Sequence, residues 1–126
     1  MSNDFLNVFL NEMKTNVNGF IAVAVTEIES GLSFGNLTTD PAFDPELAAA
    51  YNLEVVKAKL SAVKALNLNQ EIEDILITLS NQIHIIDISP NKKFMIYLAA
   101  DSTKANLGMT RAVLRKHKLE LEKNLA

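Results

Sequence analysis

The 126-residue chain contains no cysteine, only two histidines and only four glycines. Without cysteine it has no disulfide framework, no thiolate metal site and no cysteine nucleophile. His84 and His117 lack the His-x-x-x-His spacing of a zinc site, and Gly35 and Gly108 are too isolated for a phosphate-binding loop. The sequence therefore predicts a protein that is not an enzyme and has no catalytic residues, metal or cofactor.

Long apolar runs and targeting signals are also missing. No apolar run approaches the about 20 residues of a membrane span, and the start Met-Ser-Asn-Asp has no basic region. Ser2 stands where N-myristoylation needs glycine, and there is no C-terminal cysteine for prenylation. We therefore expect a cytoplasmic protein with no membrane partner.

The net charge of −3 is unevenly distributed, since basic residues dominate from Lys104 onward. Because the chain is acidic overall and lacks alternating basic and aromatic residues, we expect no nucleic-acid binding. Lys104, Arg111, Arg115 and Lys118 recur on one side of the last predicted helix. The favoured interpretation is a solvated helix face, and the alternative is a docking surface for an acidic partner.

Apolar residues make up 48% of the sequence, which predicts a single folded domain over residues 1–126. The predicted order of elements is α-β-β-α-β-β-β-α. Asp44 and Pro45 form a helix start, and Gly31 supplies a hairpin turn because glycine accepts positive φ. The predicted helices are Asp4–Met13, Pro45–Leu66 and Lys104–Asn124, and the predicted strands are Phe20–Thr26, Leu32–Leu37, Ile72–Leu79, Ile83–Ile88 and Phe94–Ala100.

The ends of the first and last helices carry residues suited to capping. Ser2 or Asn3 is the expected cap of the first helix, and Asp101 or Ser102 that of the last. Gly108 is expected to let the last helix pack closely on the sheet.

The strands Ile83–Ile88 and Phe94–Ala100 do not alternate between apolar and polar residues. Such strands lie in a sheet that is covered on both faces, and the short turns between them make antiparallel neighbours. The predicted fold class is therefore α/β (α+β), a three-layer α/β/α sandwich around a five-stranded antiparallel sheet. His84 and Asp87 should lie on opposite faces of that sheet, which argues against a catalytic pair.

The long middle helix has two apolar faces. One face carries Ala49, Leu53, Val56, Leu60 and Val63, and the nearly opposite face carries Leu47, Tyr51, Val55, Ala58, Ala62 and Ala65. The first face suits packing on the sheet. A single small domain has little left to cover the second face, which predicts a two-fold homodimer. The alternative is that the first or last helix covers this face within one chain.

The strand Ile72–Leu79 is predicted to lie at the sheet edge, where an apolar strand needs a partner. Together the helix and this strand define the predicted dimer interface, and the charged flank of the helix defines a possible docking site for another protein. The interface residues are Tyr51, Val55, Ala58, Ala62, Ile75 and Ile77, and the possible docking residues are Glu54, Lys57 and Ser61.

Over essentially its whole length the chain resembles the Roadblock family, the dynein light chain superfamily with a profilin-like three-layer fold. No single residue of the resemblance is specific, but the order and spacing of several together are. They are Gly19, Gly31, the run Glu46-Leu47-Ala48-Ala49-Ala50, Asp101, the run Ala105-Asn106-Leu107-Gly108, and Arg111.

The resemblance implies a homodimer formed by the middle helix and third strand, which acts as a scaffold for a Ras-like small GTPase. One bacterial branch of the family consists of homodimers that stimulate GTP hydrolysis by a polarity GTPase. Two alternatives stay open, namely a structural adaptor without a GTPase and a small-molecule sensor with a similar fold. Nothing else in the sequence supports an arginine finger at Arg111 or Arg115.

Overall fold

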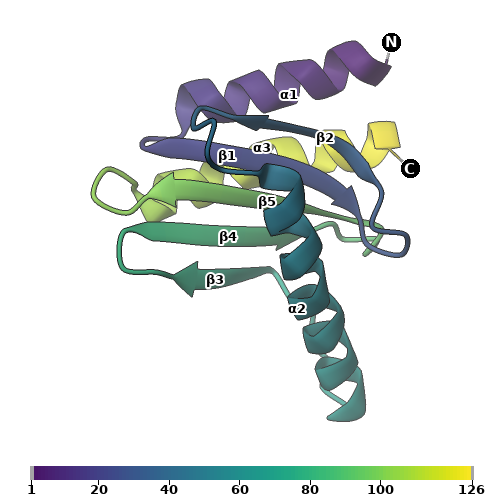
Figure 1. Ribbon diagram of the computed structural model, residues 1–126. Coiled ribbons are helices and arrows are strands. Elements are labelled where there is room, and N and C mark those ends of the chain that lie inside the picture. Colours follow the sequence, from purple (N-terminus) through teal and green to yellow (C-terminus); the bar gives the residue numbers. More distant parts are fainter. Residues whose placement is uncertain (1, 126) are drawn as a thin grey trace.

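The computed structural model describes the backbone of residues 2–125 and the side chains of residues 5–125 (Figure 1). The cap predicted at Ser2 or Asn3 lies outside the described side chains. The order α-β-β-α-β-β-β-α is confirmed. The elements are α1 (Ser2–Asn16), β1 (Phe20–Glu27), β2 (Ser33–Thr38), α2 (Pro45–Ala65), β3 (Asp74–Thr78), β4 (Gln82–Ile88), β5 (Phe94–Asp101) and α3 (Leu107–Leu125).

The five strands form one antiparallel sheet in the order β2-β1-β5-β4-β3. The central strand β5 is buried from Phe94 to Ala100, because β1 and β4 flank it and helices cover both of its faces. This burial explains why its sequence is apolar without alternation. The edge strands β2 and β3 are only partly buried.

Helices α1 and α3 lie on one face of the sheet and α2 lies on the other (Figure 1). Alternate strand residues divide between two hydrophobic cores, as the pleat requires. On the α1 and α3 side the core includes Val23, Val25, Ile85, Ile96 and Leu98. On the α2 side it includes Ala24, Ile86, Met95, Tyr97 and Ala99. The predicted three-layer sandwich is confirmed.

Helix α2 begins and ends close to the predicted residues. The Asp44 carboxylate accepts hydrogen bonds from the backbone N–H groups of Glu46 and Leu47, both at 3.1 Å, and Pro45 occupies the first turn. At the other end Asn67 adopts φ of 54°, a conformation that asparagine tolerates better than most residues. Gly31 adopts φ of 78° in the β1–β2 turn, as predicted.

The predicted start of the last helix is wrong. Helix α3 begins at Leu107 rather than Lys104, and its cap is Asn106, whose side-chain oxygen accepts from the Met109 N–H at 3.0 Å. The Asp101 carboxylate instead accepts from the N–H and hydroxyl of Thr103, which forms a separate turn before the helix.

The predicted packing role of Gly108 is also wrong, whereas Gly19 makes a close approach. Gly108 is exposed, and the nearest atom to an added Cβ would be 3.6 Å away. Gly19 has φ of 75°, and an added Cβ would lie 2.9 Å from the Asp101 carbonyl oxygen. Glycine is therefore required at the start of β1 but not in α3.

Candidate protein-interaction surface on α2 and β3

Helix α2 crosses the strands steeply and extends past the β3 edge of the sheet (Figure 1). Its 21 residues span about 30 Å. Five strands at their usual spacing span only about 19 Å. Ala49, Leu53 and Val56 are buried against the sheet, whereas Leu60 and Val63 nearer the overhanging end are half-buried. The helix is thus longer than its own sheet can cover.

The outer side of α2 is an exposed apolar stripe. Tyr51 is 73% exposed and Leu66 is 68% exposed, and Leu47, Val55 and Ala58 are exposed as well. Ala62 is half-buried. The alternative that α1 or α3 covers this stripe is wrong, because both helices lie on the opposite face of the sheet (Figure 1). We call this surface, defined by Leu47, Tyr51, Val55, Ala58, Ala62 and Leu66, the α2 stripe.

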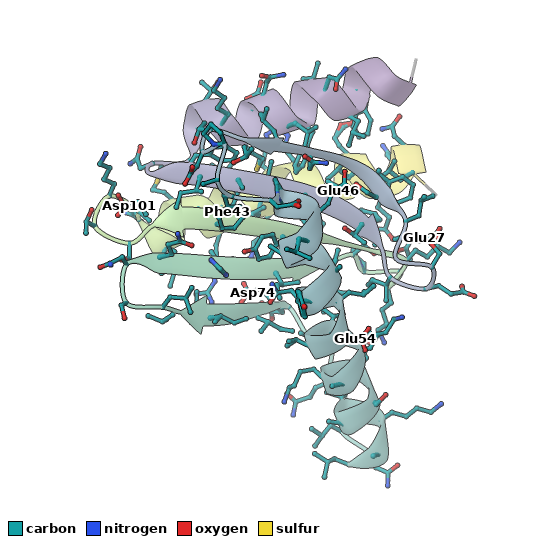
Figure 2. All side chains as sticks on the ribbon, viewed as in Figure 1. Glu27, Phe43, Glu46, Glu54, Asp74 and Asp101 are labelled. Carbon is teal, nitrogen blue, oxygen red and sulfur yellow. The ribbon has the colours of Figure 1, made fainter. Side chains whose placement is uncertain are left out.

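The charges of α2 are segregated along its length. Glu46 and Glu54 lie in the first half, and Figure 2 shows both side chains on the helix. Lys57, Lys59 and Lys64 all follow them. The predicted docking residues Glu54, Lys57 and Ser61 are exposed. The acidic half of the helix also carries Asp44 at its N-cap.

Strand β3 runs along the edge of the sheet, as predicted, although it is shorter than the range Ile72–Leu79. Ile72 precedes the strand and packs against the α2-side core together with Ile75 and Ile77. Both strand isoleucines are half-buried, while Leu76 on the other face and Leu79 after the strand are exposed. An apolar edge of this kind is a template for pairing with another chain.

The hydrogen-bond pattern shows which groups face the free edge of β3. The Leu79 N–H donates to the Gln82 carbonyl at 2.9 Å, so Leu79 and Gln82 are a bonded pair. Because bonded and non-bonded pairs alternate in an antiparallel ladder, Ile77 and Ile75 also face β4 with their backbone groups. The backbone groups of Leu76 and Thr78 therefore face outward.

Several exposed apolar residues near this surface were not among the predicted interface residues. They are Leu47, Leu66, Leu68, Leu76 and Leu79. The helical period that selects Tyr51, Val55, Ala58 and Ala62 continues to Leu66, and this signal was available in the sequence. The helical period could not identify Leu68, Leu76 and Leu79, because their exposure depends on which strand forms the edge of the sheet.

A polar network lies on the α2 side of the sheet around His84. Its Nδ1 lies 3.0 Å from the Tyr97 hydroxyl, its Nε2 lies 2.8 Å from Gln82 Oε1, and the Phe43 ring meets it edge-on. Burial lowers the pKa of His84 and raises that of Tyr97. A neutral imidazole satisfies both contacts, with Nε2–H donating to Gln82 and Nδ1 accepting from Tyr97. Both ring nitrogens of His84 are therefore engaged in hydrogen bonds to neighbouring strand residues.

Asp87 faces the other side of the sheet, as predicted, and belongs to a group of ion pairs with α3. Its Oδ1 accepts from Lys118 Nζ at 2.9 Å, and the Asp87 side chain is only 4% exposed. Burial raises the pKa of the Asp87 carboxyl, and the hydrogen bond and charge of Lys118 oppose this rise. The ammonium group of Lys118 therefore compensates the buried charge of Asp87 within the fold.

The interpretation of the basic stripe as a solvated helix face is wrong for Arg111 and Lys118, whereas Arg115 is exposed and Lys104 lies before the start of α3. Arg111 binds Asp74 through two hydrogen bonds, Nε to Oδ2 at 2.9 Å and Nη2 to Oδ1 at 3.0 Å. Arg115 approaches Glu73 at 3.5 Å. The sequence could not show this, because the carboxylates lie 31 to 42 residues away along the chain. Three of the four basic residues therefore have partners inside the chain.

The hydrogen bonding of buried polar side chains and the character of the helices were compared with what a ligand site or a membrane span would require. Within residues 5–125, every buried side-chain nitrogen or oxygen has a hydrogen-bond partner. No orphaned polar group in that part of the chain therefore points to a small-molecule ligand. None of the helices within residues 2–125 is both long and apolar enough to span a bilayer.

Comparison with known proteins gives matches in structure but not in sequence. No protein-family model matches the sequence, and no curated protein matches it significantly. MglB from Myxococcus xanthus superposes with a TM-score of 0.82 at 15% identity, covering 95% of this chain and 86% of that one. A Roadblock/LC7 domain from Streptomyces avermitilis gives 0.81 at 10% identity, with coverage of 94% and 95%.

The gliding protein MglB from Thermus thermophilus gives a TM-score of 0.81 at 14% identity, covering 98% of this chain and 90% of that one. At these identities a structural match identifies the fold. Each of the three matches covers at least 94% of this chain. The resemblance seen in the sequence is thereby confirmed at the level of the fold, and the protein has the Roadblock/LC7 fold.

Proposed function

We propose that the protein is a homodimeric, non-catalytic platform that binds and regulates a Ras-like small GTPase. The observation that carries the dimer is the α2 stripe on a helix that overhangs its own sheet. The fold is that of MglB and of a Roadblock/LC7 domain, and one MglB structure is described as a tetrameric arrangement. The role toward a GTPase follows from the resemblance of the sequence to the Roadblock family.

A two-fold axis perpendicular to the sheet accommodates both parts of the predicted interface. It brings two β3 edges together in antiparallel orientation and keeps both α2 helices on the same side. The outward backbone groups of Leu76 and Thr78 then pair with those of a second copy. The overhanging end of each α2 then lies over the sheet of the other copy, where the half-buried Leu60 and Val63 cover Ile75 and Ile77. The two helices meet side by side along the α2 stripe.

The segregated charges of α2 support an antiparallel approach of two copies. In that orientation the half with Glu46 and Glu54 lies beside the half with Lys57, Lys59 and Lys64 of the second helix. A parallel approach would place like charges together. The surface is therefore complementary to itself in charge as well as in apolar character.

Sedimentation analysis of the wild type and of Ala58→Glu tests the dimer. The substitution buries an unpaired charge at the helix crossing, so we expect a dimer for the wild type and a monomer for the variant. Ala112→Glu on the exposed side of α3 is the matched control and should stay dimeric. A monomeric wild type at micromolar concentration would overturn the dimer.

A pull-down with Ras-like GTPases locked in the GTP form tests the partner. The protein should bind the GTP form more strongly than the GDP form. The dimeric Ala112→Glu control should bind the GTPase, and the monomeric Ala58→Glu variant should bind less. At protein concentrations where each variant sediments as a dimer, substitutions at Glu54, Lys57 or Ser61 should weaken capture if the charged flank of α2 contacts the GTPase. Equal binding of both nucleotide forms would argue against regulation through the nucleotide state.

A further inference from the structure

The edge strand β3 carries a destabilising arrangement of charge on its α3 side. Asp74 lies directly opposite Asp87 of β4 in the register, and both carboxylates face α3. Like charges at directly opposite positions of an antiparallel pair repel one another. The Asp74 side chain is 14% exposed and that of Asp87 is 4% exposed, so water screens the repulsion poorly.

Helix α3 supplies the cations that offset this repulsion. Arg111 and Lys118 are seven residues apart and therefore project from one side of the helix. Arg111 binds Asp74 in a two-pronged geometry, and Lys118 binds Asp87 (Figure 2 shows Asp74 at the start of β3). Arg115 and Glu73 are more exposed, at 57% and 81%, so their pair contributes little.

Apart from its ladder with β4 and the half-buried Ile75 and Ile77, β3 has few other contacts that hold it in place. It has five residues, none of them fully buried, and within the described residues it pairs on one side alone, with β4. Helix α2 begins over the opposite edge of the sheet, where Asn36 of β2 donates to Glu46 at 2.8 Å. Short, exposed elements with few packing partners open more readily than the core. The Arg111–Asp74 pair therefore ties β3 to α3, while Lys118 offsets the charge of the facing Asp87 in β4.

We propose that α3 regulates the dimerisation edge. Arg111 holds β3 through Asp74, and Lys118 offsets the charge of the facing Asp87 in β4. We call these two ion pairs the clasp, and β3 offers its free edge to a second copy only while the clasp is closed. The clasp itself is independent of any dimer, but its control of self-pairing rests on the proposed function. An agent that competes for these two cations would release the edge strand. The basic face of α3 therefore acts inside the chain.

Amide hydrogen exchange in full-length protein separates the two parts of this proposal. The amides of Ile75 and Ile77 face β4 and report the clasp, whereas those of Leu76 and Thr78 face outward and report self-pairing. In Arg111→Met and in Lys118→Met we expect the Ile75 and Ile77 amides to exchange about tenfold faster, since each variant leaves a carboxylate uncompensated. The amides of β5 should be unaffected, and the dimer should weaken in parallel.

Two further variants keep the test specific. Arg115→Met removes the exposed cation next to the clasp and should change neither set of amides. Adding Asp74→Asn to Arg111→Met removes the repelling charge and should restore the exchange of Ile75 and Ile77 toward wild type. Unchanged exchange in both clasp variants, or equal acceleration in Arg115→Met, would overturn the clasp. Wild-type Leu76 and Thr78 amides that are unprotected at every concentration would overturn the self-pairing, whatever the clasp variants show.

Discussion

Gly19 and Gly108, two of the three glycines that carry the resemblance to the Roadblock family, should respond in opposite ways to alanine. Gly19→Ala introduces a Cβ at φ of 75° and 2.9 Å from the Asp101 carbonyl oxygen, a backbone atom that cannot move aside cheaply. The left-handed conformation costs about 1 to 2 kcal/mol for a non-glycine residue. Relief of the contact disturbs the hydrogen bond from the Asp101 N–H to the Gly19 carbonyl, which adds about 1 kcal/mol.

Gly108→Ala should instead stabilise the protein. Residue 108 is helical, exposed and free of contacts closer than 3.6 Å, so alanine fits without strain. Glycine is less favourable than alanine in a helix interior by about 0.5 to 1 kcal/mol. Gly108 lies in the first turn of α3, so the gain in stability should be part of that amount. The expected difference in unfolding free energy between the two variants is therefore about 2 to 4 kcal/mol.

Urea denaturation at constant temperature measures this difference through the transition midpoints. For a domain of this size, each 1 kcal/mol also shifts the thermal midpoint by about 2 to 5 °C, which gives an independent check. The slope of the urea transition should not change, because neither variant alters the area buried. A Gly108→Ala variant that loses as much stability as Gly19→Ala would refute the reasoning and restore a packing role for Gly108.

Two other predictions concern the charges of α2 and the histidine network. Glu54→Lys should raise the dimer dissociation constant about two- to thirtyfold, since each exposed ion pair contributes about 0.2 to 1 kcal/mol and the two-fold axis repeats it. Combining this change with Lys57→Glu should recover part of the loss in sedimentation experiments at low salt, and failure to recover would show that α2 does not meet its copy antiparallel. Burial lowers the pKa of His84 in the folded protein, so the neutral form is favoured and folding stability should fall as the pH drops below the unfolded value of 6.5. His84→Gln should flatten the pH dependence of urea unfolding between neutral pH and the lowered pKa of folded His84. An unchanged profile would show that His84 is not the group whose protonation destabilises the fold.

Much of the fold was predictable because its signals are local. Asp44 and Pro45 mark the start of α2 through chemistry within one turn, and Gly31 marks a hairpin through its own φ angle. The doubly apolar strand Phe94–Ala100 predicted a sheet covered on both faces, which the structure confirms. The start of α3 was missed because Asp101, Ser102 and Asn106 are all competent caps. The choice between them depends on the turn that Thr103 closes on Asp101.

The candidate site was predictable only in part. The period of α2 located Tyr51, Val55 and Ala58, whose exposure the structure establishes, but their role in a dimer stays a proposal. Leu76 and Leu79 were missed because a strand sequence does not state which of its edges is free. The basic stripe of α3 was misinterpreted at Arg111 and Lys118 because a charge pattern does not identify partners that are distant in the chain.

The sequence by itself determined the element order, the two apolar faces of α2 and the absence of cysteine chemistry, because these depend on residue type and on periods of 2 and 3.6. Only the tertiary structure decided which apolar face stays uncovered, since that requires knowing that α1 and α3 lie together on the far side of the sheet. It alone also brought Arg111 to Asp74 and Lys118 to Asp87. An ion pair depends on the distance between two groups in the folded protein, and residues 31 to 37 positions apart in the chain come within that distance only through the tertiary fold.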